Sequence, residues 1–133
     1  MVWSCLVSIL PGMAQTEKLT DYVNPFVGTD GYGNVYPGAQ IPFGGIQISP
    51  DTDSRFYDAA SGYKYNHLTL MGFSLTHLSG TGIPDLGDFL FIPGTGEMKL
   101  EPGTHEDPDQ GYRSRYSHDK EWASPNYYAV ELA

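Results

Sequence analysis

Cysteine and basic residues are both scarce in this 133-residue chain, and each scarcity excludes a class of protein. The single cysteine, Cys5, rules out a disulfide framework within the chain and a zinc site built on several cysteines. Only 7 Lys and Arg stand against 16 Asp and Glu, which gives a formal net charge of −9. Such a surface repels nucleic-acid phosphates, and no basic cluster offsets it. We therefore predict no nucleic-acid partner.

Long periodic helices and close-spaced histidine motifs are missing as well. Apart from a weak turn over residues 51–60, no stretch carries apolar residues at the i, i+3, i+4, i+7 spacing of an amphipathic helix. The four histidines lie too far apart for pair motifs such as HExxH. Glycine (16), proline (10) and aromatic residues (14%) are plentiful instead, and this mixture favours an all-β domain with many turns.

Short β-prone segments recur along the chain with turn residues between them, which is the pattern of a β-sandwich. In the first segment, Ile46 and Ile48 alternate with Gln47. The predicted strand segments are residues 41–50, 68–75, 88–93, 97–103, 113–118 and 126–133. The polar stretch GTHEDPDQGY, residues 103–112, is predicted to be a surface loop.

The first residues are set apart from the fold. WSCLVSIL is an apolar run too short to span a bilayer. Gly12 and Ala14 occupy the −3 and −1 positions of a cleavage site, so residues 1–14 are predicted to be a signal-peptide remnant, with a disordered N-terminus as the alternative. Residues 15–133 form the predicted domain. Because the chain stops inside a strand-like run, we expect this domain to be incomplete.

The loop THLSGTGIPDLGD, residues 76–88, joins two apolar runs. Its glycines can adopt positive φ, so the backbone could form a nest of N–H groups for an anion or a sugar hydroxyl; a tight turn is the alternative. His77 could donate to a ligand or serve as a buried structural residue. Gly80 and Gly82 fill two positions of GxGxxG, but Asp85 fills the third, which disfavours a dinucleotide site.

The stretch DTDSRFYDAASGYKY, residues 51–65, combines carboxylates with four aromatic rings. Sugars have apolar C–H faces and polar edges, so this composition suits a sugar site. The alternative is a loop whose aromatic rings pack on the core. Asp85 and Asp88 could form a carboxylate pair, but we interpret them as turn caps, since aspartate readily bonds to its own backbone.

Four long segments, in order along the chain, resemble the N-terminal domain of glycoside hydrolase family 92. They are YVNPFVGTDGYGNVYPGAQIPFGGIQISPDT, ASGYKY, GFSLTHLSGTGIPDLGDFLFIPGTG and YRSRYSHDKEWASPNYYAVEL. The similarity runs from about Asp21 to Ala133. It implies a β-sandwich of the galactose-mutarotase-like kind, here incomplete, that packs against a C-terminal (α/α)6 barrel absent from this sequence.

The resemblance also implies a function, that of a secreted or periplasmic, calcium-dependent exo-α-mannosidase that hydrolyses terminal α-linked mannose with inversion. The family's general acid, general base and most calcium ligands lie in the C-terminal domain. We therefore name no catalytic or metal-binding residue here and expect the chain alone to be inactive. The expected partners are mannose-containing glycans and the barrel domain. A stand-alone carbohydrate-binding β-sandwich is the alternative.

The resemblance further implies that the sugar-binding loops lie at the edge of the sandwich that faces the barrel. The implied substrate-binding residues are Tyr57, Asp58, Ser61, Gly62, His77, Gly80, Thr81 and Gly82. Relatives commonly carry tryptophan at the position of Tyr57, cysteine at that of Ala60 and histidine at that of Leu75. A tyrosine offers the sugar a smaller aromatic plate than a tryptophan does.

Overall fold

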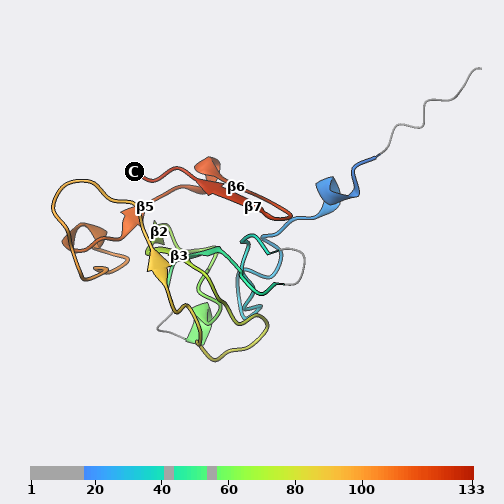
Figure 1. The fold of residues 1–133 in the computed structure, drawn as a ribbon, viewed down its shortest axis with the longest axis horizontal. Coiled ribbons are helices and arrows are strands. Elements are labelled where there is room, and N and C mark those ends of the chain that lie inside the picture. The colour runs from blue at the N-terminus through green and yellow to red at the C-terminus, as the bar shows by residue number, and fades with distance from the viewer. Residues whose placement is uncertain (1–16, 41–43, 54–56) are drawn as a thin grey trace, which may run out of the picture.

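The computed structural model describes residues 17–40, 44–53 and 57–133, with the side chain of Asp58 left out (Figure 1). The strands are β1 (Ser49–Asp51), β2 (Thr69–Leu70), β3 (Gly72–Ser74), β4 (Leu90–Phe91), β5 (Ser114–Arg115), β6 (Glu121–Ser124) and β7 (Tyr127–Val130). Short 3-10 segments are η1 (Leu19–Tyr22), η2 (Tyr57–Ala59), η3 (Pro108–Gln110) and η4 (His118–Lys120). The predicted all-β class is confirmed, and none of the helices in the described residues is long and apolar enough to cross a membrane.

The strands pair antiparallel in three small sheets. In the largest sheet β3 is central, with β1 on one side and β4 on the other, and Phe73 lies opposite both Pro50 and Phe91. The second sheet pairs β2 with β5, and the third is the β6–β7 hairpin. Met71 separates β2 from β3, and its N–H donates to the Asp51 carbonyl over 2.7 Å. The continuous segment that contains β2 and β3 thus contributes one strand to the second sheet and one to the largest sheet.

The β6–β7 hairpin lies along one side of the body (Figure 1) and is fixed to it through a buried carboxylate. Glu121 of β6 accepts hydrogen bonds from the hydroxyls of Tyr63 (2.8 Å) and Tyr128 (2.5 Å). Burial, together with the charge of Glu121, raises the pKa of both phenols, so they stay protonated donors. The rings of Phe73 and Tyr128 meet edge to face at 5.9 Å between centroids, which packs β7 on β3.

The buried interior is more polar than the composition suggests. Tyr63 and Leu70 are among its few large apolar members. The buried polar residues are Thr29, Asn34, Ser49, Asp51, Thr52, Asp53, Ser61, Lys64, Thr69, Ser74, His77, Arg113 and Glu121. Large apolar side chains lie instead at the surface, with Ile46 62% and Phe91 60% exposed.

One predicted strand is wrong and one strand escaped prediction. Residues 97–103 form no strand, and Met98 and Leu100 are 83% and 82% exposed. Their alternation indicates extended chain, but a strand also requires a hydrogen-bonded neighbour along its length. β6 was not predicted, because its sequence EWAS mixes polar and apolar residues directly before the Pro125–Asn126 turn. Among the described residues of the 51–60 stretch, the expected weak helical turn corresponds to the 3-10 turn η2.

Candidate functional site

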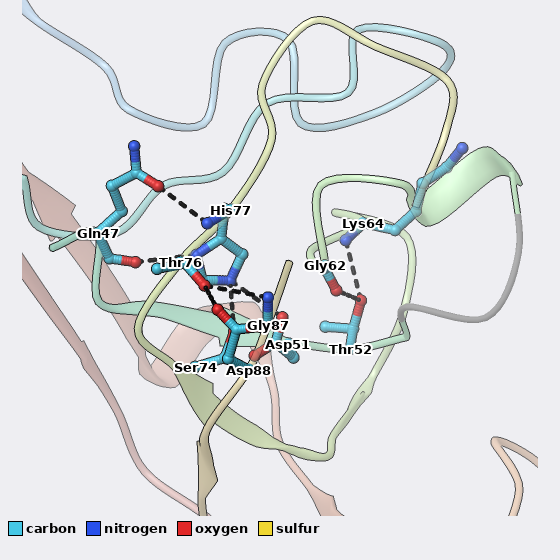
Figure 2. Close-up of polar contacts among 10 residues, drawn as sticks. All are labelled: Gln47, Asp51, Thr52, Gly62, Lys64, Ser74, Thr76, His77, Gly87 and Asp88. Atoms are coloured by element: carbon cyan, nitrogen blue, oxygen red, sulfur yellow. Dashed lines mark hydrogen bonds and ion pairs between the residues drawn. The ribbon is translucent and has the colours of Figure 1, made fainter. Parts of the chain in front are cut away.

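The loop over residues 76–88 is closed at its base by its own backbone. The Gly87 N–H donates to the Thr76 carbonyl over 2.8 Å, and an isolated bridge pairs His77 with Leu86. The Thr76 hydroxyl donates to Asp88 Oδ2 over 3.1 Å (Figure 2), and Asp85 Oδ1 accepts from the Leu86 N–H. The two aspartates therefore close and cap the turn, which confirms the structural interpretation of this carboxylate pair.

Tyr57 lies directly against the tip of this loop. A Cβ placed on Gly82 would come within 2.4 Å of the Tyr57 Cζ atom, so the ring fills the space that a side chain would need. The ring is 64% exposed. Gly80 is anchored from the other side, because its N–H donates to the Asn34 carbonyl over 2.6 Å. We call Tyr57, Gly80, Thr81 and Gly82 the tyrosine–glycine rim.

Ser61 and Gly62 lie below the surface rather than on it. Gly62 has a φ of +87°, and a Cβ there would come within 2.1 Å of Asp51 Oδ1. Its carbonyl accepts from the N–H groups of Thr52 (2.7 Å) and Asp53 (3.1 Å). Ser61 is 1% exposed, and its hydroxyl has no hydrogen-bond partner within the described part of the chain.

His77 is enclosed by the chain's own polar groups (Figure 2). Its backbone N–H donates to Gln47 Oε1 over 2.9 Å, and its Nδ1 is 2.8 Å from the Gln47 carbonyl oxygen. Its Nε2 is 3.0 Å from Asp51 Oδ1 and 2.9 Å from the Ser74 hydroxyl. The ring also faces that of Tyr36, with 4.9 Å between centroids. Every polar atom of the residue's ring is thus engaged within the protein.

The structure therefore brings the predicted residues into two layers. Tyr57, Gly80, Thr81 and Gly82 form the outer layer, and Ser61, Gly62 and His77 form the inner one. Asp58 belongs to η2, but its side chain lies outside the described atoms. A role of these residues in substrate binding remains a prediction. Sequence reasoning missed the anchors Gln47 and Asp51, because no motif links them to a histidine so distant in the chain.

A second buried polar cluster holds the predicted surface loop at residues 103–112. His105 Nδ1 is 2.8 Å from the Thr69 hydroxyl, and its Nε2 is 3.3 Å from Asp53 Oδ2. Arg113 NH2 lies 4.0 Å from the same carboxylate oxygen, and its NH1 donates to the Thr52 carbonyl. Burial and then the positive charge of Arg113 lower the pKa of His105, against the raising effect of Asp53. The cluster pins this loop to β2.

Two hollows in the described surface lie away from the rim. The smaller hollow, about 320 Å³, is lined by Val23, Pro25, Gly38, Gln40 and residues 124–126. The larger, about 1020 Å³, runs between residues 90–100 and 111–114, with Leu132 at its end.

A profile of the glycosyl hydrolase family 92 N-terminal domain matches residues 22–133. The chain belongs to this family. Membership confirms the predicted β-sandwich class, whereas the domain limits at residues 14 and 15 remain predictions. The signal-peptide prediction falls on residues 1–14, which lie outside the described part of this family 92 domain.

Three relatives illustrate the similarity. A protein of Arthroderma benhamiae described as an uncharacterized secreted glycosidase is 30% identical over 113 residues, which cover 84% of this chain and 14% of the relative. The solved structure of the family 92 glycosyl hydrolase ccman5 is 34% identical with a TM-score of 0.69, over 86% of this chain and 14% of that one. The structure of a family 92 inverting mannosidase from Bacteroides thetaiotaomicron is 31% identical with a TM-score of 0.68, over 89% and 16%. The family 92 domain described here thus spans a small share of each relative's length.

Proposed function

We propose that the full-length protein carrying this family 92 domain is a secreted or periplasmic exo-α-mannosidase that releases terminal α-linked mannose with inversion. Family membership and the likeness to an inverting mannosidase support the activity, and a relative described as secreted supports the location. One observation carries the role of this chain: the exposed ring of Tyr57 is set on Gly82, beside the loop that contains Gly80 and Thr81.

The tyrosine–glycine rim has the chemistry of one wall of a monosaccharide site. An aromatic ring packs against the apolar C–H face of a sugar, while a loop with little side-chain bulk lets hydroxyls approach the backbone. Ligand sites commonly bury roughly 70–90% of the ligand surface, which one exposed wall does not achieve. The proposal therefore assigns the opposite wall to the C-terminal barrel domain, against which the exposed apolar side chains of this chain would pack.

The carboxylates best shielded from solvent in this chain are already engaged. Asp51 contacts His77, Asp53 contacts His105, and Glu121 accepts from two tyrosines. Inverting hydrolysis needs two carboxyl groups about 6.5–9.5 Å apart, with room for a water beside the sugar. Because these carboxylates are engaged, we infer that the general acid and the general base come from the barrel domain. The chain alone would then bind weakly and hydrolyse nothing.

Calcium, which the family resemblance implies, finds no matching ligand set in the part of the chain that the structure describes. Within residues 17–40, 44–53 and 57–133, no three His, Cys, Asp or Glu side chains gather closely enough to hold a metal ion. The proposal accordingly leaves most of the calcium ligands to the barrel domain, as the family resemblance implies.

The direct test is the stereochemistry of the product. Proton NMR of the full-length protein acting on an aryl α-mannoside is expected to show β-mannose as the first-formed anomer, because inversion places water on the face opposite the leaving group. Residues 15–133 produced alone are expected to give no turnover. First-formed α-mannose, or hydrolysis by residues 15–133 alone, would contradict the proposal.

A further inference from the structure

Both ring nitrogens of His77 face groups that accept hydrogen bonds. Nδ1 is 2.8 Å from the carbonyl oxygen of Gln47, and Nε2 is 3.0 Å from the Oδ1 atom of Asp51 (Figure 2). A backbone carbonyl can only accept, so Nδ1–H donates to Gln47, and Nε2 makes the second contact of the ring with Asp51. The Ser74 hydroxyl lies in the same corner, 2.9 Å from Nε2.

The second oxygen of Asp51 supports the same arrangement. Oδ2 is buried and has no hydrogen-bond partner among the described residues. Because Oδ2 has no partner in the described part of the chain, the contact of Oδ1 with the ring of His77 is a contact that this buried group loses at a high cost. The pair is well shielded from water, with side-chain exposures of 2% for His77 and 5% for Asp51. The ring of Tyr36 also contacts that of His77, with the two ring planes tilted by 35° and 4.9 Å between centroids.

We propose that His77 is a positioning residue whose ring, held between Gln47 and Asp51, locks the loop over residues 76–88 onto β1, and thereby holds the tyrosine–glycine rim in place. The contribution to sugar binding rests on the proposed function, whereas the locking of the loop does not. The pair lies directly beneath Gly62, where an added Cβ would come within 2.1 Å of Asp51 Oδ1 and 3.0 Å of His77 Cδ2. Movement of the ring would therefore disturb both layers of the site.

The chain offers a matched control for this pair. His118 also contacts a shielded carboxylate, with its Nδ1 2.6 Å from Glu121 Oε2. Its ring neighbours are Tyr65 and Tyr116 rather than any residue of the rim. His77→Gln and His118→Gln therefore remove the same chemical group from two similar pairs, of which one supports the loop. Asp51→Asn removes the charge of the partner while keeping its shape.

The test compares these variants in the full-length protein. His77→Gln and Asp51→Asn are each expected to raise KM for an aryl α-mannoside about tenfold with kcat changed less than about twofold, because they weaken binding rather than chemistry. The double variant is expected to lose no more than the worse single variant, because both act through one contact. Amide hydrogen exchange in residues 78–86 should be faster in both single variants and in the double variant than in the unaltered protein. His118→Gln should change neither KM nor exchange in this loop.

Three outcomes would overturn the proposal: an unchanged KM with unchanged loop exchange in His77→Gln, equal effects of His118→Gln, or full additivity of the two substitutions. If the unaltered protein turned over no α-mannoside, the proposed function would fail, and loop exchange alone would decide the positioning role. If His77→Gln did not fold, Asp51→Asn would carry the same comparison.

Discussion

Gly62 and Gly82 are glycines for two different reasons. Gly62 combines a left-handed φ of +87° with a neighbour, Asp51 Oδ1, that leaves no room for a Cβ. Gly82 has its space taken by the ring of Tyr57. The requirement for glycine at position 62 is buried and bears on the stability of the fold. The requirement at position 82 lies at the surface and bears on the orientation of the exposed Tyr57 ring.

Gly62→Ala is therefore expected to be far more destabilising than Gly80→Ala. Gly80 has a similar φ of +74° but no atom within 4 Å of an added Cβ, so its substitution costs only the left-handed strain of about 1–2 kcal/mol. At Gly62 the added methyl also breaks the His77–Asp51 contact, and losing one partner of a buried pair costs roughly 3–5 kcal/mol. Thermal melting of the two full-length variants checks this, and equal melting temperatures would contradict it.

At the scale of elements, the sequence predicted most strand positions but little of what holds them. Residues 68–75, 88–93, 113–118 and 126–133 each contain a strand, because short β-prone or alternating segments bounded by turns favour strands. Residues 97–103 fail because alternation alone does not supply a partner strand. The buried polar contacts join positions far apart in the chain, such as Tyr63 and Glu121, and no local pattern encodes them.

The loop at residues 103–112 is the element whose attachment depends on pH. Since burial and Arg113 lower the pKa of His105, the opened loop binds a proton more readily than the closed one. Stabilisation from this contact is fully present above the ordinary histidine pKa of about 6.5, and it declines as the pH falls from there toward the lowered value.

Protection of residues 104–111 against hydrogen exchange, corrected for intrinsic rates, is accordingly expected to fall between about pH 7.5 and about pH 5, the range in which an ordinary histidine titrates. In His105→Asn this fall should be much smaller, because the titrating ring is gone. A fall of equal size in the variant would assign the pH dependence to another group.

At the scale of the whole molecule, the described chain combines a polar interior with large apolar side chains at its surface, which our proposal explains by a covering surface from the rest of the full-length protein. Ile46, Phe91 and Leu100 are all more than half exposed, and the rim lies open beside the loop that carries it. Relatives many times longer than this chain supply a natural source for the covering surface. The account therefore treats the sugar site as shared between this family 92 domain and the rest of the protein.

The central claim is that the exposed ring of Tyr57 forms part of the sugar site in the full-length mannosidase. Steady-state kinetics of Tyr57→Ala, beside Tyr127→Ala as an exposed tyrosine on β7, tests it most directly. The account predicts a KM for an aryl α-mannoside raised about three- to tenfold by Tyr57→Ala, matching the roughly 0.5–1.5 kcal/mol of an aromatic contact, and unchanged by Tyr127→Ala. A KM unchanged by Tyr57→Ala in a folded, active protein would contradict the account.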